Sequence, residues 1–444
     1  MNTIVKNTIL ANFLCNDRPN SYELLGIKFA RANRFEYANL IYGYPKEYDA
    51  TKRPPASMQK RAFDKFEHLE IPERAFYHKE FRDGMKFEYS EDYLNMNIYL
   101  PKKDGKKYPV IVFFHGGGFD SGSINESPFD GDALAGRGNI VIFAQYRVGI
   151  FGYLTNTNIQ ARYGHDGNFG LDDMLCALKW VKKNVSSFGG DENNITVMGQ
   201  SAGGMSIQYL LCSDIAKDYI NKAIMISSCG LFPKFSLPRP SEKTREYWNE
   251  VIQISGAKSF EEFKNLPSEK LLECVEIQKS KRKDNTYNTM PVIDGYIIKE
   301  GIDKAIKMAK NVPLIASFTN NDMYTFLLAH ITKKYAKKHS AFIYYFDINA
   351  KGDDNLAFHS SDLRYLFGTL NTSWRPYTPH DYKISEMLMD YISNFTKKGN
   401  PNGTGLPKWD LYKNMPLRIT DNYVKMEKCD TFNLIKNTFK GDPK

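Results

Sequence analysis

Short runs of consecutive hydrophobic residues recur along the central part of the chain and are separated by longer segments whose apolar positions have helical spacing. Uninterrupted apolar runs of this kind are typical of strands that are buried on both faces of a sheet. We predict such strands at residues 110–114, 140–145, 195–198, 223–227, 313–318 and 341–346, with an earlier antiparallel strand at 96–100. The segments between them predict helices at residues 171–185, 202–211, 242–254, 268–278, 363–367 and 384–397.

Strands that alternate with helices predict a fold of the α/β class, with a central, mostly parallel, twisted sheet and helices on both of its faces. The segment 49–60, which contains Pro54-Pro55, is typical of a loop. Residues 240–285 are charged and have helical spacing, and we expect them to form a cap beside the sheet. Because no stretch resembles a linker, we expect residues 1–444 to form one domain with this cap inserted around 240–285.

A serine lies between small residues directly after the predicted strand 195–198. Residues 199–204 read Gly-Gln-Ser-Ala-Gly-Gly, and a predicted helix follows at once. A strand, a sharp turn and a helix in this order hold the hydroxyl of Ser201 at a helix N-terminus, where negative charge is favoured. Bulky neighbours would clash in such a tight turn, which explains the small residues around the serine. Taken alone, however, Gly-x-Ser-x-Gly also occurs by chance in long chains.

A second group of glycines ends the predicted strand 110–114. Residues 114–119 read Phe-His-Gly-Gly-Gly-Phe, and successive glycines leave their backbone N–H groups unobstructed. Ester hydrolysis needs such donors, because the tetrahedral intermediate is negatively charged and losing one donor costs about 3 kcal/mol of transition-state stabilisation. A flexible glycine turn is the alternative interpretation, but a position after a strand and before the serine turn is that of an oxyanion loop. The two motifs together indicate a serine hydrolase.

A nucleophilic serine needs a histidine as base. Histidine occurs at positions 68, 78, 115, 165, 330, 339, 359 and 380. The base is expected late in the chain, on a loop after a strand, and His359 fits because it follows the predicted strand 341–346 and a polar loop. His380 is the alternative, in a turn with two prolines and no preceding strand. His330 and His339 flank a lysine-rich segment that is typical of a solvated helix.

The histidine in turn needs a carboxylate, which should follow the predicted strand 313–318. Asp322 does so, and the order Ser201, Asp322, His359 is that of a serine triad in an α/β hydrolase. Asp294 is the alternative, in a turn before a glycine, where aspartate is common for structural reasons. A turn or a helix cap would also account for Asp322 without catalysis. From its position we prefer Asp322 as the acid.

Composition and charge narrow the class of protein further. The formal net charge is +9, but the lysines are spread along the chain without a nucleic-acid-binding motif, so nucleic acid is not an expected partner. No run of about 18 apolar residues occurs, and we expect no membrane span. The N-terminal residues lack the features of a secretory signal, and the six cysteines are scattered without metal-ligand spacing. We therefore expect a reduced, cytoplasmic chain with no bound metal.

With these residues in view, the chain resembles the type-B carboxylesterase (carboxylesterase/cholinesterase-like) family of α/β-hydrolases. The resemblance extends over roughly residues 22–412, and the ordered combination of motifs is highly specific. It rests on residues 26–30 with Arg34-Phe35, on residues 91–99, 114–119, 146–149, 167–173, 188–191 and 199–204, on Asp294-Gly295, and on residues 358–362. It implies the α/β-hydrolase fold and a reaction that needs no metal or organic cofactor.

The resemblance also implies roles for individual residues. Ser201 would be the nucleophile, His359 the base and Asp322 the orienting acid. Backbone N–H groups of three residues would bind the oxyanion, one serine would lie near the acid, and one ion pair would be structural. These residues are Gly117, Gly118 and Ala202 for the oxyanion, Ser227 near the acid, and Arg34 with Glu91 for the ion pair.

The chain departs from the family pattern at several positions. The family acid is usually glutamate followed by glycine, whereas Asp322 is one methylene shorter and is followed by Met323. Either the backbone compensates for this or another carboxylate is the acid. The family's early disulfide has no counterpart, because Ser57 and Tyr93 stand where its cysteines would be. The first tryptophan is Trp180, so the tryptophan with which cholinesterases bind cationic ligands is missing, and choline esters are not expected substrates.

The acid and the base are close in sequence. Asp322 and His359 are 37 positions apart, where the family normally has a longer helical segment. From this spacing we expect a shortened helical cap and an open pocket that accommodates bulky substrates.

These observations predict a serine carboxylesterase that acts on a small-molecule ester through an acyl-enzyme, as a monomer or homodimer. An amidase or acyltransferase would use the same residues, and an acylated sugar, aryl ester, amide or carbamate is an alternative substrate. Related binding proteins without activity usually lack the serine or the histidine, whereas Ser201, His359 and the glycine loop are all present here. Because the base must be neutral imidazole, we expect activity to fall on acidification.

Overall fold

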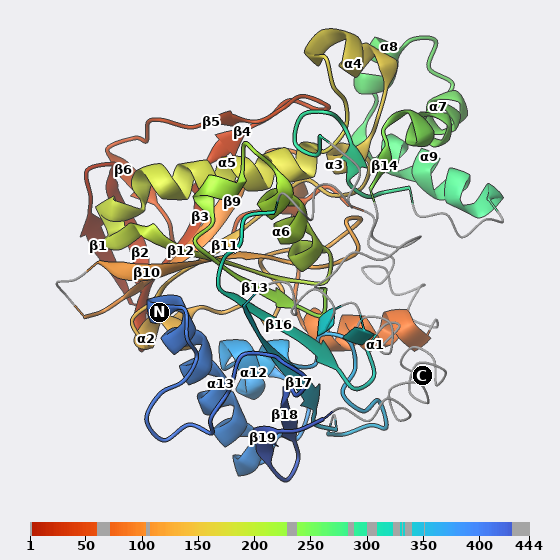
Figure 1. Cartoon of the computed structure of the whole chain (residues 1–444). Coiled ribbons are helices and arrows are strands. Elements are labelled where there is room, and N and C mark those ends of the chain that lie inside the picture. Colours follow the sequence, from red (N-terminus) through yellow and green to blue (C-terminus); the bar gives the residue numbers. More distant parts are fainter. Residues whose placement is uncertain are drawn as a thin grey trace.

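The fold is built on one large mixed sheet (Figure 1). A computed structural model describes residues 2–59, 72–103, 107–228, 238–282, 288–299, 309–322, 329–330, 332–333, 340–349 and 351–428. Within them the main sheet has 13 strands in the spatial order β1-β2-β3-β9-β11-β10-β12-β13-β16-β17-β18-β19, and β6 pairs with β2.

The strands in the middle of this sheet run parallel, and antiparallel strands flank them. The parallel strands are β11 (Ile140–Ala144), β10 (Tyr108–Phe114), β12 (Gly190–Gln200), β13 (Lys222–Ile226), β16 (Leu314–Thr319), β17 (Ala341–Asp347) and β18 (Leu417–Thr420). The flanking strands are β1 (Thr3–Asn7), β2 (Asn12–Asp17), β3 (Ser21–Lys28), β9 (Asn95–Pro101) and β19 (Val424–Met426), while β6 (Glu47–Asp49) runs parallel to β2.

Short strand pairs and helices complete the described structure. The pairs are β4 (Ala30–Arg31) with β5 (Asn39–Leu40), β7 (Ala56–Ser57) with β8 (Tyr89–Ser90), and β14 (Arg239–Pro240) with β15 (Val292–Ile293). The α-helices are α1 (Pro72–Phe81), α2 (Asp132–Gly136), α3 (Gly149–Tyr153), α4 (Thr157–Tyr163), α5 (Phe169–Asn184), α6 (Ala202–Cys212), α7 (Glu242–Ser255), α8 (Phe260–Lys264), α9 (Ser268–Lys281), α12 (Leu363–Phe367) and α13 (Pro379–Lys398). Short 3-10 turns lie at Val185–Phe188, Lys217–Tyr219 and Leu370–Thr372.

Helices cover both faces of the sheet, with α5 and α6 on one side and α2, α12 and α13 on the other (Figure 1). The central strand β10 shows why its sequence is a continuous apolar run. Val110, Val112 and Phe114 belong to the buried cluster that contains residues of α5 and α6. Ile111 and Phe113 belong to the cluster that contains residues of α12 and α13. Because side chains alternate along a strand, a strand covered on both faces must be apolar at every position.

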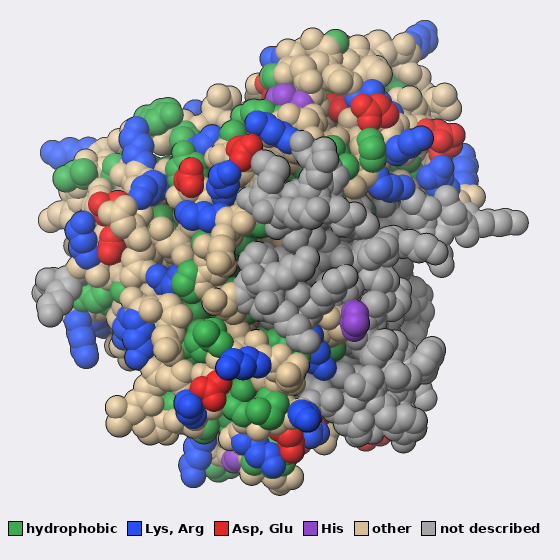
Figure 2. All heavy atoms as spheres, in the orientation of Figure 1, with side chains coloured by type: hydrophobic (Ala, Val, Ile, Leu, Met, Phe, Trp, Pro, Cys, Tyr) green, Lys and Arg blue, Asp and Glu red, His purple; other side chains and the backbone are tan. Residues whose placement is uncertain are grey.

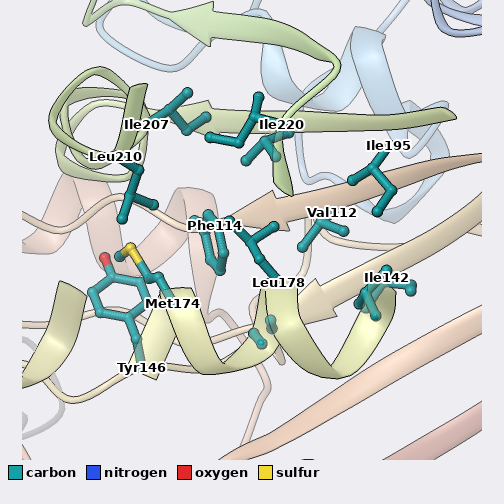
Figure 3. Close-up of a cluster of buried hydrophobic side chains, with 14 of the residues drawn as sticks. Val112, Phe114, Ile142, Tyr146, Met174, Leu178, Ile195, Ile207, Leu210 and Ile220 are labelled. Carbon is teal, nitrogen blue, oxygen red and sulfur yellow. The ribbon is translucent and has the colours of Figure 1, made fainter. Parts of the chain in front are cut away.

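Figure 3 shows part of the first of these clusters. Met174 and Leu178 of α5 lie beside Phe114 and Val112 of β10, and Ile207 of α6 approaches the same side of the sheet. These side chains are buried, and burying one such side chain contributes about 1.5–3 kcal/mol. This layer fixes α5 and α6 against the strands that carry the serine turn and the glycine loop.

Each predicted strand and helix is present, with boundaries that differ by a few residues. The largest difference among the predicted helices is in α13, which begins at Pro379, earlier than the predicted start at 384. Thr378 and Asp381 form a capping box in front of it, and Pro379 occupies the first turn, where its missing N–H costs no hydrogen bond. The proline-containing stretch that we interpreted as a turn is therefore the start of this helix.

The N-terminal strands were missed by the sequence analysis. In β1 every described side chain is exposed or half-buried, so no alternation of apolar and polar residues marks the strand. β12 also begins before the predicted residue 195. The sequence analysis missed its first residues because most of them are polar and lie where the strand leaves the core. Edge strands and strand ends lack the buried face on which pattern recognition depends.

Helices α7, α8 and α9 form a separate layer at one end of the sheet, together with α4 (Figure 1). Trp248 of α7, Phe263 of α8 and Leu271 of α9 pack in one buried cluster with Phe151 of α3 and Phe169 of α5. The helical character that we predicted for residues 240–285 is confirmed for α7 to α9.

On the surface, lysine and arginine side chains are scattered over the face shown in Figure 2. Acidic side chains lie among them on that face, so the excess of basic residues is not gathered into one stripe there. Among the helices of the described residues, none is both long enough and apolar enough to cross a membrane.

Candidate active site

The serine turn is the sharp strand-to-helix turn that the sequence predicted, and its backbone is strained. Ser201 follows β12 directly and has φ 52° and ψ −125°, a conformation that costs a non-glycine residue about 1–3 kcal/mol. Its N–H donates to the carbonyl of Ile226 at the end of β13, and its carbonyl accepts from Met205 N in α6, both at 2.9 Å. These backbone bonds on either side hold the serine at the apex of the turn.

Glycines around the serine are required by close backbone contacts. A Cβ added to Gly203 would stand 2.2 Å from the carbonyl oxygen of Phe114, and one added to Gly199 would stand 2.6 Å from the carbonyl carbon of Gly203. Neither position has room for a side chain, because the opposing atoms belong to the backbone. Helix α6 can therefore start directly behind the strand, and Ala202 is its first residue.

The glycine loop lies beside the serine. A Cβ added to Gly116 would stand 3.1 Å from Ser201 Cβ, which places the two turns in contact. This contact follows from the sheet, because β10 and β12 are parallel neighbours in which Phe114 pairs with Gly199. Gly117 and Gly118 have φ values of 111° and 62°, and a left-handed backbone of this kind is accessible to glycine without strain.

Buried side chains hold the glycine loop in place. Tyr146 donates its hydroxyl hydrogen to the carbonyl of His115 at 2.7 Å, and the two rings stack with centroids 4.4 Å apart. Gln59 donates to the carbonyl of Gly122 and accepts from its N–H, each at 2.8 Å. His115 is thus part of the loop's support, which explains a histidine in this motif without a catalytic role.

Asp322 and His359 are brought together by the backbone. Asn321 and Phe358 form an isolated parallel bridge, so the residues that follow them lie side by side. His359 Nδ1 lies 2.5 Å from Asp322 Oδ1, and Asp322 Oδ2 accepts from Thr319 N at 3.2 Å. The side chain of Asp322 is fully buried and that of His359 is 12% exposed. Because a carboxylate can only accept, Nδ1 carries the proton and Nε2 faces the serine turn as an acceptor.

The second ring nitrogen of His359 contacts the residue before the serine. Gln200 Nε2 lies 3.0 Å from His359 Nε2, and Gln200 is the last residue of β12. Since Ser201 is its neighbour in the chain, the structure brings Ser201, His359 and Asp322 to one place at the carboxyl ends of the strands. This is the edge at which α/β sheets commonly bind ligands.

Ser227 lies at the end of β13, between the strands that lead to the serine and to the acid. It has φ 49°, and its N–H donates to the carbonyl of Ser317 at 3.2 Å. Its N–H also lies 3.4 Å from Ser317 Oγ, which is 3.5 Å from Asp362 Oδ2. Through Ser317, the hydrogen bonds of Ser227 therefore lead to a second carboxylate, Asp362.

Asp362 is the part of this site that sequence reasoning missed. Its carboxylate is completely buried, and Tyr344 donates its hydroxyl hydrogen to Oδ2 at 2.6 Å. Burial raises the pKa of Asp362 to about 6, the hydrogen bond from Tyr344 opposes the rise, and the charge of Asp322 adds to it. Its place three residues after His359 was the available signal, but position alone does not reveal that a carboxylate faces the core.

The alternative candidates lie elsewhere. His380 is exposed in the first turn of α13, and His330 is also exposed. Asp294 accepts hydrogen bonds from Tyr296 N at 3.1 Å and Ile298 N at 2.8 Å, as expected for a structural turn. His68, His339 and Met323 lie outside the described residues.

The resemblance also implied an ion pair, a missing disulfide and a shortened cap. The ion pair between Arg34 and Glu91 is present, with Arg34 Nε donating to Glu91 Oε2 at 2.9 Å. Ser57 and Tyr93, which replace the family's cysteines, are both buried. The shortened cap remains a prediction, because residues 323–328, 331 and 334–339 lie outside the described part of the chain.

Comparison with known proteins gives consistent matches. The model of the Carboxylesterase family matches residues 14–339 and 325–431. Para-nitrobenzyl esterase of Bacillus subtilis (strain 168) is 29% identical over 384 residues, which cover 73% of this chain and 77% of that protein. Carboxylesterase 5A of Felis catus is 27% identical over 428 residues, which cover 77% and 75%. A solved structure of PNB esterase superimposes with a TM-score of 0.83 at 24% identity, covering 98% of this chain and 99% of that one.

These matches agree with the sheet and with the predicted class of enzyme. The structural match confirms the predicted α/β-hydrolase fold, with its mostly parallel central sheet and helices on both faces. The family match confirms the predicted class of enzyme, a carboxylic ester hydrolase. The chain belongs to the carboxylesterase family.

Proposed function

We propose that the chain hydrolyses carboxylic esters through an acyl-enzyme on Ser201, with His359 as general base and Asp322 as the acid that orients it. The observation that carries this proposal is the 2.5 Å contact between His359 Nδ1 and Asp322 Oδ1. It directs the unprotonated Nε2 toward the serine turn, as proton transfer from the hydroxyl requires. The glycine loop in contact with that turn supplies backbone donors.

In the first step Ser201 Oγ attacks the carbonyl carbon of the ester while His359 Nε2 takes the hydroxyl proton. The carbonyl oxygen becomes an anion and accepts hydrogen bonds from the N–H groups of Gly117, Gly118 and Ala202. When the intermediate collapses, the bond to the alcohol oxygen breaks and His359 returns the proton to the departing alcohol. The acyl group remains on Ser201.

In the second step a water molecule attacks the acyl carbonyl carbon, and His359 Nε2 takes its proton. The same N–H groups bind the second oxyanion, and collapse of the intermediate breaks the bond to Ser201 Oγ. The carboxylic acid leaves, and the proton returns from His359 to the serine. Nothing but water is consumed besides the ester.

Two features of the chain stabilise the charges that develop in the transition state, which are the oxyanion of the substrate and the imidazolium of His359. Ala202 is the first residue of α6, and the N-terminal end of a helix carries partial positive charge that favours an oxyanion. Asp322 is fully buried, so its charge acts on the imidazolium with little screening by water. Both effects are stronger in the transition state than in the ground state, which is the condition for catalysis.

We propose small-molecule esters as the substrates, with aromatic esters as the first class to test, because one relative is named for para-nitrobenzyl ester cleavage. The experiment is hydrolysis of p-nitrophenyl esters from acetate to decanoate by wild type, Ser201→Ala and His359→Ala. Ser280→Ala, at an exposed serine of α9, is the matched control.

We expect kcat to fall by about 10⁴-fold or more in the Ser201 and His359 variants and to stay unchanged in the control. The dependence on chain length would then give the size of the acyl pocket. A folded wild type that hydrolyses none of the esters, and whose Ser201 is not labelled by an organophosphate, would overturn the proposal in favour of a binding protein. Faster release of product on adding an alcohol would identify acyl transfer in place of hydrolysis.

A further inference from the structure

The base nitrogen of His359 has a partner that the proposed reaction does not use. Gln200 Nε2 lies 3.0 Å from His359 Nε2. Gln200 is 5% exposed, so bulk water has little access to the amide. The same nitrogen must accept the proton of Ser201, the next residue in the chain. In the proposed reaction, two side chains from adjacent positions therefore compete for one lone pair.

The direction of this hydrogen bond follows from the other end of the ring. His359 Nδ1 lies 2.5 Å from a carboxylate oxygen of Asp322, which can only accept, so Nδ1 is the protonated nitrogen. In the neutral ring Nε2 is then an acceptor, and the Gln200 amide is the donor. When the ring becomes an imidazolium, Nε2 turns into a donor, and an NH2 group cannot accept from it. With Nε2 of the amide toward the ring and Oε1 toward Gly116, the contact is therefore compatible only with neutral imidazole.

The glycine loop leaves room for the amide. A Cβ added to Gly116 would stand 2.3 Å from Gln200 Oε1, so the amide fills the space that a side chain at position 116 would occupy. Gln200 thus lies between the glycine loop on one side and the histidine on the other. A buried amide in such a position is held by packing on one side and by its hydrogen bond on the other.

We propose that Gln200 is a positioning residue that holds His359 by Nε2 between turnovers and must release this nitrogen before Ser201 can transfer its proton. The inference rests on the proposed roles of Ser201 and His359. Release is a rotation of the amide or a small movement of the ring and breaks one hydrogen bond. The contact favours the neutral ring, which is the active form, and at the same time competes with the serine for the lone pair.

The charges near His359 stay the same when Gln200 is replaced by a neutral residue. Asp322, on the loop after β16, contacts Nδ1, and Asp362, at the start of α12, interacts with the ring electrostatically. Gln200 contributes from β12 and is uncharged. A shift in the titration of His359 in Gln200→Met would therefore report the lost hydrogen bond and no altered charge.

The test combines two measurements on three forms of the full chain. The first follows the ring nitrogens of His359 by NMR of protein labelled with ¹⁵N-histidine, with the signal assigned through His359→Gln. The second is the pH dependence of kcat/KM for p-nitrophenyl acetate. Both are made on wild type, Gln200→Met and Gln200→Glu. Gln253→Met, at an exposed glutamine of α7, is the control for loss of a glutamine.

In Gln200→Met we expect the titration midpoint of His359 and the acid limb of kcat/KM to move up by about half a pH unit, the effect of one net hydrogen bond on the neutral ring. The plateau at high pH should rise up to about fivefold because the competition with Ser201 is removed. In Gln200→Glu a carboxylate can accept from the imidazolium. The titration midpoint of His359 should therefore move further up than in Gln200→Met, and the plateau of kcat/KM at high pH should fall. The control should match wild type.

Unchanged midpoints in both Gln200 variants would overturn the proposal, and so would a lower plateau in Gln200→Met, which is the result of a purely structural role. If Gln200→Met does not fold, Gln200→Ala, which also removes the amide without adding a charge, takes its place. If wild type hydrolyses no ester, the proposed function fails, but the NMR titration still tests the contact between Gln200 and His359.

Discussion

Asp322 and His359 meet because Asn321 and Phe358, the residues before them, are paired as neighbouring strand residues are. The N–H of Asn321 donates to the carbonyl of Ala357 at 2.8 Å, and this places Asp322 Oδ1 2.5 Å from His359 Nδ1. An aspartate is one methylene shorter than the glutamate usual in the family. Here the backbone bridge brings the two loops close enough for the shorter side chain to reach the ring.

This geometry predicts that Asp322→Asn loses most of the activity. An amide at position 322 can donate to Nδ1 and so favours the wrong tautomer of His359, which in serine proteases costs about 10⁴-fold in kcat. The measurement is kcat for p-nitrophenyl acetate. Asp294→Asn is the matched control and should retain activity, because Asp294 accepts from Tyr296 N and Ile298 N of its own turn and these hydrogen bonds are structural. Equal losses in the two variants would contradict our choice of acid.

The buried carboxylate of Asp362 predicts that its replacement by asparagine raises the stability of the protein at pH 7 but lowers its activity. Its pKa is about 6 in the folded protein, raised from 3.8 by burial and by Asp322 and opposed by Tyr344. Between about pH 4 and pH 6 the unfolded chain loses this proton first, so the stability of wild type falls as the pH rises through that window. Asp362→Asn should therefore be more stable than wild type at pH 7, by at most about 3 kcal/mol.

The measurement is urea unfolding of Asp362→Asn and of wild type at pH 7 and at pH 4. The difference in stability should be present at pH 7 and should disappear at pH 4. Because one negative charge near His359 is removed, kcat/KM at pH 7 should fall several-fold, far less than in Asp322→Asn. Tyr344→Phe removes the hydrogen bond that stabilises the ionised carboxylate and should be less stable than wild type at pH 7. A destabilised Asp362→Asn at pH 7 would argue against an energetic cost of this buried charge.

The close packing behind the serine predicts that Gly203→Ala is damaging. The new Cβ would lie 2.2 Å from the carbonyl oxygen of Phe114 and 2.6 Å from that of His115, so the backbone must move. We expect a loss of about 1–3 kcal/mol in stability and about 100-fold in kcat, since a shift of about 1 Å in a catalytic group has this effect. Gly43→Ala, where nothing lies within 4 Å of the added Cβ, should leave both values unchanged.

An ion pair between helix α9 and the residue that follows the glycine loop predicts a smaller effect that depends on salt. Lys279 Nζ of α9 lies 2.6 Å from Asp120 Oδ2, directly after the loop. Although burial alone would lower the pKa of Lys279, Asp120 raises it above the ordinary value. The side chains are 38% and 33% exposed, so the pair is worth about 1 kcal/mol or less.

Lys279→Met should therefore raise KM or lower kcat by up to about fivefold at low ionic strength, and the difference from wild type should shrink in 0.5 M salt. Lys281→Met, at an exposed lysine two positions along α9, is the control. If both variants behave alike at all salt concentrations, the ion pair does not position the loop.

Local features of the site could be predicted because their physics is local. The serine turn needs small residues within a few positions of Ser201, and the glycine loop needs residues that tolerate positive φ. The buried parallel strands could be predicted for a related reason, since a strand covered on both faces is apolar throughout. The exposed edge strand β1 and the polar start of β12 escaped prediction because neither has that constraint.

By itself, then, the sequence determined the fold class, the apex serine, the glycine loop and a late histidine, because each depends on short stretches with strict steric or hydrophobic requirements. Only the tertiary structure decided which carboxylate contacts His359, that Gln200 occupies its other nitrogen, and that Asp362 is buried behind the site. These contacts join segments that are far apart in the chain. They depend on the order and register of parallel strands, which place the ends of β10, β12, β13, β16 and β17 at one edge of the sheet.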